Sequence, residues 1–236
     1  SQESGSDEDK ITVRDYFTLK RTIRDMVNRG AQSGTVIFDN AYDGDISADM
    51  ASACWEVRTK DALCAYCVEN ISYELNHIIT YDEAKIYVSY MQSGVSIDEI
   101  IRLPYSTDIE SVLRQSMQDS RGNVVILTGK SSLAAEDVEN MAANVYKSDP
   151  MLSPKEPAAS VNMFSGENMQ RLYDIHINYG EAAKELAAKK EKLAGFDPFD
   201  GVGTEEMSEL DRATLAFEYL TGNCTLCEEG QKNNIY

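Results

Sequence analysis

The sequence predicts an α+β fold in which two copies of an α-β-α-β-β unit form sandwiches of helices on a sheet, followed by a C-terminal helical segment. Helix-like and strand-like patterns alternate along the chain, the same order of patterns occurs twice, and corresponding patterns keep a constant spacing. We therefore divide the 236 residues into an acidic leader at 1–10, a first repeat at 11–92, a second repeat at 93–180 and a C-terminal segment at 181–236.

The first repeat opens with an amphipathic helix over 12–29, for which Thr12 and Asp15 are expected to form the capping box and which Gly30 ends. The patterns that follow are, in chain order, a strand at 34–38, a turn-rich segment at 39–44, a helix at 47–61 and strands at 68–75 and 84–91. Both final strands alternate polar and apolar residues, which is typical of strands with one buried face.

The second repeat shows the same order of patterns. Thr107 and Glu110 are expected to cap its first helix, and the later patterns are, in chain order, a strand at 123–128, a helix at 134–146 and strands at 159–164 and 170–179. Aligning Val36-Ile37 with Val125-Ile126 gives an offset of 89 residues (125 − 36), and aligning Tyr90 with Tyr179 gives the same offset (179 − 90). Equal spacing at independent elements predicts that the two repeats superpose, with both tyrosines at equivalent strand ends.

The two ends of the chain differ in composition from the repeats. The leader is small, polar and acidic, which indicates a flexible tether, and such a segment commonly follows the cleavage site of a bacterial secretion or lipoprotein signal. We therefore expect an extracellular or cell-surface bacterial protein that can carry an N-terminal lipid anchor. The C-terminal segment predicts helices at 181–193 and 205–221 on either side of a loop at 195–203.

Charge and hydropathy argue against two classes of partner. Asp and Glu number 40 against 22 Lys and Arg, and the resulting net charge of −18 repels phosphate backbones, so nucleic acid is not expected as a partner. No apolar run approaches the ~20 residues that a membrane helix needs, so no membrane insertion beyond a lipid anchor is expected.

Five cysteines are an odd number, which argues against a disulfide framework. Cys64 with Cys67 and Cys224 with Cys227 form two Cys-x-x-Cys pairs, and four such thiolates could build a tetrahedral zinc site. The pairs lie 157 residues apart (224 − 67) without the glycine-rich knuckle of zinc ribbons, and the first pair lacks the βαβ context of a redox dithiol. We expect small buried apolar residues here, and a zinc-stabilised domain is the weaker alternative.

The chain has two histidines, His77 and His176, and both fit strand positions. A thiol enzyme needs a base within ~3 Å of its nucleophile, and Cys67 with His77 is the first pair to test for that role. No motif supports the pair, so we assign no catalytic residue.

Two loops resemble ligand-binding motifs but lack essential positions. Residues 128–132 follow a strand as a phosphate loop does, yet Val124 stands where the first glycine belongs, so a turn and a helix cap are expected instead. Residues 39–44 resemble the start of a calcium loop, but Ala41 and Met50 stand at ligand positions. We assign no cofactor-binding and no metal-binding residue.

The end of the chain resembles a known family. Tyr219-Leu220, Asn223 and Ile235-Tyr236 fit the segment that leads into the catalytic core of secreted bacterial transglutaminase-like proteins, and the α/β segments that end at Tyr90 and Tyr179 resemble the region before that core in clostridial members. The resemblance implies that the family's catalytic cysteine, histidine and aspartate fall after Tyr236, and that Cys224 and Cys227 have no family role.

Two functions therefore compete. The first is a non-enzymatic extracellular module of a bacterial surface protein that binds protein or cell-wall material through its duplicated sheets. The alternative is the leading half of a transglutaminase-like cysteine peptidase or acyltransferase whose catalytic core lies beyond Tyr236. The sequence that follows Tyr236 in the gene distinguishes them.

Overall fold

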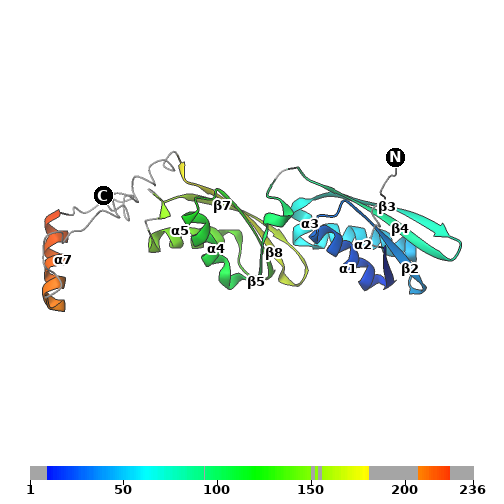
Figure 1. The fold of residues 1–236 in the computed structure, drawn as a ribbon, viewed down its shortest axis with the longest axis horizontal. Helices are drawn as coiled ribbons and strands as arrows, with labels where there is room; N and C mark the ends of the chain where they lie inside the picture. Colours follow the sequence, from blue (N-terminus) through cyan, green and yellow to red (C-terminus); the bar gives the residue numbers. More distant parts are fainter. Residues whose placement is uncertain (1–9, 93, 150–151, 154–155, 181–206, 224–236) are drawn as a thin grey trace, which may run out of the picture.

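A computed structural model describes residues 10–92, 94–149, 152–153, 156–180 and 207–223 (Figure 1). These residues form two units in which helices pack on a four-stranded sheet, and a C-terminal helix follows them in the chain. We call strands β1–β4 with their helices unit 1, and strands β5–β8 with their helices unit 2. The predicted α+β class with two repeated units is confirmed.

Each unit has the order β-α-β-α-β-β. Unit 1 contains β1 (Lys10–Asp15), α1 (Tyr16–Asn28), β2 (Ser33–Asp43), α2 (Ile46–Lys60), the short α3 (Ala62–Cys67), β3 (Val68–Ile78) and β4 (Tyr81–Tyr90). Unit 2 contains β5 (Ile101–Tyr105), α4 (Ile109–Gln118), β6 (Asn123–Lys130), α5 (Ala135–Ser148), β7 (Ala158–Ser165) and β8 (Arg171–Asn178). The last described element is α7 (Glu209–Asn223), which overlaps the helix predicted at 205–221. The helix predicted at 181–193 and the loop predicted at 195–203 lie outside the described residues.

The two sheets have the same strand order. Sheet A is β1-β2-β4-β3 and sheet B is β5-β6-β8-β7; the first pair of strands in each sheet is parallel and the other two pairs are antiparallel. The prediction missed β1 and β5, the leading edge strand of each unit. Both are short, and β5 contains Pro104, a residue that strands tolerate at a sheet edge. The leader consequently ends at residue 9, because Lys10 already pairs with Thr35 on β2.

The predicted capping boxes are wrong at both first helices. In unit 1 the cap is Asp15, whose carboxylate accepts from the Thr18 amide at 2.7 Å while the Thr18 hydroxyl accepts from the Asp15 amide at 3.2 Å. Thr12 instead lies in β1. In unit 2 a short 3₁₀ turn at 106–108 precedes α4, so Thr107 lies in that turn and Glu110 pairs with Arg114 rather than with a cap.

The first helices of the two units bury the same face. Three residues of α1 and three of α4 are fully buried, and each α4 residue lies 90 positions after its α1 counterpart (109 − 19, 113 − 23, 117 − 27). The six residues are Leu19, Ile23 and Val27 in α1 and Ile109, Leu113 and Met117 in α4. This spacing of three and four residues forms one stripe on a helix, so both helices lie on their sheets in the same orientation.

The helix ends are duplicated as well. Gly30 and Ser120 both have a left-handed backbone, with φ of 69° and 55°. The next residue closes each helix with a backbone hydrogen bond: the Ala31 amide donates to the Met26 carbonyl, and the Arg121 amide donates to the Ser116 carbonyl. The carbonyl of the same residue then accepts from a tyrosine: the Tyr90 hydroxyl donates to the Ala31 carbonyl at 2.8 Å, and the Tyr179 hydroxyl donates to the Arg121 carbonyl at 3.0 Å. The predicted equivalence of Tyr90 and Tyr179 is confirmed.

The alignment of the central strands needs a correction of one residue. In unit 1, Val36 on β2 pairs with Ala84 on β4. The residue of β8 that corresponds to Ala84 is Tyr173, and Tyr173 pairs with Ile126 and not with Val125. The offset is therefore 90 from β2 to β6 (126 − 36) and 89 from β4 to β8 (173 − 84). A shift of one position moves a strand residue to the other face of the sheet. Val36 faces the helices of unit 1, while Val125 faces away from those of unit 2.

Val125 marks the interface between the units. Val125, Leu127 and Leu172 are at most 7% exposed, and all three belong to the hydrophobic core of unit 1. Helix α3 packs on β7 and β8, with the Tyr66 and Phe164 rings in edge-to-face contact at 5.4 Å. One end of the sheet B face that α4 and α5 leave uncovered is therefore buried against unit 1, which lies beside sheet B in Figure 1.

An ion-pair network reinforces this interface. The Lys20 ammonium lies 2.6 Å from Glu56 in its own unit and 2.8 Å from Glu167 in unit 2, and Arg24 contacts the Asp61 carboxylate at 3.1 Å. Because these groups are largely withdrawn from water, they pair more strongly than exposed charges do. None of the helices in the described part of the chain is long and apolar enough to cross a membrane.

Candidate functional site

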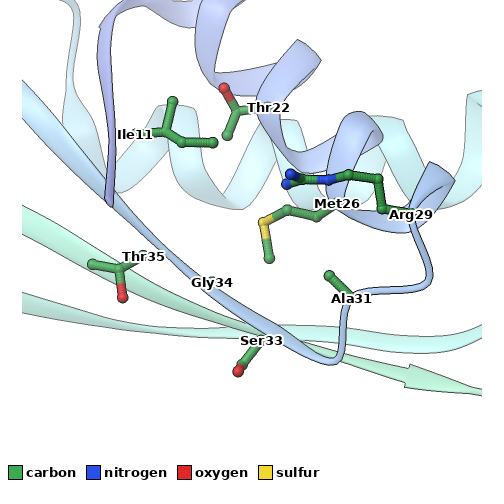
Figure 2. A pocket seen from close by; sticks show the side chains of 8 residues that line it. All are labelled: Ile11, Thr22, Met26, Arg29, Ala31, Ser33, Gly34 and Thr35. Carbon is green, nitrogen blue, oxygen red and sulfur yellow. The ribbon is translucent and has the colours of Figure 1, made fainter. Parts of the chain in front are cut away.

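A groove lies between α1 and the edge strand β1 in unit 1 (Figure 2). Its volume is about 290 Å³. The lining residues come from β1, α1 and the chain that leads into β2: Ile11, Thr22, Met26, Arg29, Ala31, Ser33, Gly34 and Thr35. In Figure 2 the Met26 thioether points toward Gly34, and the Arg29 guanidinium lies beside Met26. The groove therefore combines an apolar floor with one cation.

Gly34 makes the room for Met26. A Cβ atom at this position would lie 2.8 Å from the Met26 methyl carbon, closer than real Cβ contacts come. Unit 2 carries Val124 at the equivalent position, 90 residues later (124 − 34), and Val124 is 4% exposed. The helix residue of unit 2 that corresponds to Met26 is Ser116 (116 − 26 = 90), so unit 1 combines a large helix residue with a glycine and unit 2 has a small helix residue and a valine at the equivalent positions.

Unit 2 has an equivalent groove. Its volume is about 420 Å³, and its lining includes Ile101, Arg121, Asn123, Val124 and Val125, which follow residues of the first groove by 90 positions. Two further lining residues, Val95 and Glu99, come from the segment that connects the units. A segment of the chain itself therefore lines the second groove.

The cysteines of the described chain are buried structural residues. Cys54, Cys64 and Cys67 are free thiols at most 6% exposed. Burial raises the pKa of Cys54 and of Cys67 to about 11, and burial next to the Asp61 carboxylate raises the pKa of Cys64 further. These thiols remain protonated near neutral pH, and a protonated thiol is neither a good nucleophile nor a metal ligand.

The repeat supports this interpretation. In β3 of unit 1, Ile71 pairs with Val88, and in β7 of unit 2, Ala159 pairs with the equivalent Ile177. The offset between β3 and β7 is therefore 88 residues (159 − 71), and we apply the same offset to α2 and α3, which precede β3. By this offset Cys54 corresponds to Ala142 (142 − 54), which is also buried. Cys64 corresponds in the same way to Leu152 (152 − 64), a member of the unit 2 core. The expectation of small apolar core residues is confirmed for these cysteines, while Cys224 and Cys227 lie outside the described residues.

The structure does not bring Cys67 and His77 together. Cys67 ends α3 just before β3 begins, and His77 is near the other end of β3, so roughly 30 Å of extended strand separates them. His77 pairs with Asp82 at 2.7 Å on the exposed β3–β4 hairpin. His176 pairs with Asp174 at 3.1 Å on sheet B. Neither histidine is placed to activate a described thiol.

The two motif-like loops have structural roles. Thr128 continues β6, where its hydroxyl donates to the Arg171 carbonyl at 3.1 Å, and the Ser131 hydroxyl lies 2.6 Å from the Tyr173 hydroxyl. The helix cap expected here is wrong, because α5 begins only at Ala135. The turn-rich segment expected at 39–44 is wrong, because β2 runs on to Asp43; within it the Asp39 carboxylate accepts from the Ala41 amide at 2.8 Å. No group of three His, Cys, Asp or Glu side chains among the residues that the structure describes is placed to hold a metal ion.

Comparison of the chain with protein-family models, with curated proteins and with solved structures gave no match. Sequence reasoning did not find the groove, because no residue of it belongs to a recognised motif. The correspondence between the two grooves appears only after the two units are aligned with an offset of 90.

Proposed function

We propose that this chain is a non-enzymatic binding module of a bacterial surface protein, and that its unit 1 groove is the contact site for protein or cell-wall material. The observation that carries the proposal is the open groove beside an edge strand, with an apolar floor and a cation. The thiols that the structure describes support it, since burial raises the pKa of Cys54 and Cys67 to about 11 and His77 lies at the far end of β3 from Cys67.

Display selection tests the binding role directly. Random peptides are selected against the full 236-residue chain, and enriched sequences are synthesised and titrated by calorimetry, with purified bacterial sacculi tested in parallel by co-sedimentation. We expect saturable binding of selected peptides or of sacculi. The absence of both would contradict the proposal.

An activity assay tests the non-enzymatic part. Thiol-dependent acyl transfer requires a thiolate, a neighbouring base and an oxyanion hole. We therefore expect no amine incorporation into a glutamine-containing peptide and no peptide hydrolysis. Measurable turnover that a thiol-blocking reagent abolishes would overturn the non-enzymatic role, and serine substitutions of each cysteine would then identify the nucleophile.

The alternative function keeps one supporting observation. Helix α7 exposes Leu210, Phe217 and Leu220, with the Leu210 side chain 75% exposed. An apolar helix face of this kind is suited to packing against another domain. If this chain is the leading half of a transglutaminase-like enzyme, a catalytic core encoded after Tyr236 would cover these residues. The gene sequence after Tyr236 tests this, and a glycine-rich turn bearing a cysteine there would favour the alternative.

A further inference from the structure

Strands β3 and β7 form equivalent edges of sheets A and B. Within the described chain, each pairs with one strand and has no strand on its other side. Such an edge presents a row of backbone donors and acceptors with which another chain can pair, so natural sheets commonly cover or interrupt it. The two units differ in this respect, although their strands correspond residue by residue.

In unit 2 a side chain of the neighbouring helix covers the edge. The Glu139 carboxylate of α5 accepts from the Val161 amide of β7 at 2.9 Å. That amide therefore points away from β8, toward the free side of β7. Because the carboxylate holds this donor in a charge-assisted hydrogen bond, a strand added to β7 would first have to displace it.

Unit 1 lacks this cover. With the offset of 88 residues, Glu139 corresponds to Ala51 on α2 (139 − 88) and Val161 corresponds to Tyr73 on β3 (161 − 88). Fully or almost fully buried residues on the core side of the two helices support this alignment: Met50 with Val138 and Val57 with Val145. The methyl group of Ala51 cannot accept a hydrogen bond, so no side chain at this position covers the edge of β3.

The Tyr73 amide points to the free side of β3. Tyr73 pairs with Ile86 on β4 just as Val161 pairs with the equivalent Ile175 on β8, so both residues direct their backbone groups away from the neighbouring strand. In an antiparallel strand every second residue does the same, which adds Ile71 to this row. The row is therefore available for pairing with another strand.

The sequence around Tyr73 is complementary to itself in an antiparallel pair. When Tyr73 lies opposite Tyr73 of a second copy, over residues 70–76 where β3 is regular, Ile71 of each copy faces Leu75 of the other. Leu75 is 40% exposed in the single chain and would gain an apolar neighbour. Ser72 faces Glu74, whereas a register centred one residue later would oppose two Glu74 carboxylates, which destabilises a sheet.

Helix α2 offers a second contact on the same side. Because Glu139 reaches β7 from α5, the equivalent side of α2, at Ala51, faces the edge of β3. Trp55 follows Ala51 by one helical turn and is 60% exposed. A two-fold axis at Tyr73 makes the α2 helices of two copies antiparallel, which places Trp55 of one copy toward the exposed Ser47 of the other.

The charges at the two ends of α2 are complementary in this arrangement. Arg58 lies in the last turn of α2 and is exposed, and the exposed Asp45 is its N-cap. Antiparallel helices bring the last turn of one beside the N-terminus of the other, so Arg58 of each copy approaches Asp45 of its counterpart. Such a pairing of opposite charges favours this orientation.

We propose that two copies of this chain associate through their β3 edges, with Tyr73 at the two-fold axis, so that the two A sheets become one continuous sheet and the α2 helices pack beside each other around Trp55. This inference goes beyond the proposed binding function and does not depend on it. It gives a reason both for the uncovered edge and for the exposed tryptophan.

Sedimentation velocity and light scattering of the full chain at increasing concentration test the association. We expect a reversible equilibrium between monomer and dimer. Trp55 reports the contact independently, because the chain contains only 1 Trp. Its emission should move to shorter wavelength over the same range of concentration, since the dimer withdraws the indole from water.

Two variants install the unit 2 residue in unit 1. Ala51→Glu (as Glu139) supplies the missing cover of the Tyr73 amide, and Trp55→Ala (as Ala143) removes the exposed ring. Each should weaken association at least about tenfold, the loss expected when a charge-assisted hydrogen bond must be broken or a large aromatic contact is removed.

Ser52→Glu is the matched control for Ala51→Glu. It adds the same charge at the next exposed position of α2, about 100° further round the helix and away from the edge of β3. Association should stay within about threefold of the native chain, because an exposed charge outside the contact has little effect. Circular dichroism and thermal melting verify that all three variants fold.

Each result has a defined meaning. A chain that stays monomeric, a dimer that a folded Ala51→Glu variant leaves intact, or a dimer whose formation does not shift the Trp55 emission would overturn the inference. Equal weakening by Ser52→Glu would also contradict it, because added charge alone would then be the cause. If the chain is monomeric but binds display-selected peptides in a manner that Ala51→Glu abolishes, the edge accepts a peptide and the self-association fails while the binding module stands.

Discussion

Unit 1 and unit 2 share an element order, a helix-end hydrogen-bond pattern and a strand topology, but the sheet faces that their helices leave uncovered differ in chemistry. Unit 2 presents Val125, Leu127 and Leu172 on that face, and all three are buried against unit 1. The equivalent residues of unit 1 are Thr35, Ile37 and Glu83. One scaffold thus serves as a docking face in unit 2 and as a more polar face in unit 1.

This difference indicates how a duplicated fold divides its tasks. Stacked repeats need apolar faces where they meet and a polar face where the stack ends. In this chain sheet A carries the more polar face, with Thr35 and Glu83 where sheet B has Val125 and Leu172. The duplication therefore places the apolar residues of one sheet face in the interface between the units and leaves the equivalent face of the other sheet more polar.

Exchanging Leu172 and Glu83 tests the comparison with the largest expected effect. Leu172→Glu places a charge in a fully buried position of the interface and should lower the free energy of unfolding by about 3–5 kcal/mol, because no partner compensates the buried carboxylate. The reciprocal Glu83→Leu removes only the 3.5 Å pair with Lys10, so its cost should stay below about 1 kcal/mol. Urea denaturation measures both, and equal effects would contradict the functional division of the two faces.

Tyr90→Phe and Tyr179→Phe test whether the duplicated helix ends are also energetically equivalent. Each substitution removes one hydroxyl donor from a carbonyl at the end of the first helix, Ala31 in unit 1 and Arg121 in unit 2. We expect each to cost about 1 kcal/mol, the usual net value of such a hydrogen bond. Thermal and urea unfolding give the two values, and a cost confined to one tyrosine would show that the equivalence is geometric only.

The pH dependence of the ion-pair network is a third test, because unit 2 has no counterpart of it. Lys20 and Lys60 hold the pKa of Glu56 at about 2, below its ordinary value of 4.5. A carboxyl whose pKa is lower in the folded state stabilises the protein above its unfolded pKa, and this contribution is lost as the pH falls toward the folded value. The stability difference between the native chain and Glu56→Gln should therefore shrink from pH 5 to about pH 2.

The matched control is Glu110→Gln, which removes an exposed i,i+4 pair with Arg114 in unit 2. Exposed pairs of this kind contribute little, so the control should show only a small difference at any pH. If Glu56→Gln behaves like the control from pH 7 down to 2, the network does not stabilise the interface.

The sequence predicted the interior of each unit better than its edges. Strands β3, β4, β7 and β8 alternate in polarity, and helices α1 and α4 carry continuous apolar stripes, so local periodicity identified them. Strand β1 contains only two alternating apolar residues, Ile11 and Val13, before α1 begins. The predicted helix at 12–29 therefore included most of this strand. Such a short edge strand is determined by its pairing with β2, a contact that local pattern does not contain.

The misalignment of β2 and β6 has a similar cause. Residues 124–128 are all buried, because the helices cover one face of β6 and unit 1 covers the other. A strand that is buried on both faces has no alternation from which its register can be read. Only the cross-strand pairs, Val36 with Ala84 and Ile126 with Tyr173, fix it. The groove depends on this register, which is why it could not be predicted from the sequence.

Removal of residues 1–9 should have the smallest effect, and it compares how the two units use the chain that precedes them. Ahead of β5, Ile100 is 5% exposed and belongs to the unit 1 core, so the preceding segment contributes to packing there. Residues 1–9 contain no large apolar side chain, and the burial around β1 comes from Ile11 and Val13. We expect the melting temperature to change by less than about 1 °C, since 1 kcal/mol corresponds to a few degrees in a protein of this size. Removal of 1–15, which also deletes β1, is the contrasting variant and should lower the melting temperature by many degrees. A large shift for the shorter deletion would show that the first unit, like the second, depends on the segment before its edge strand.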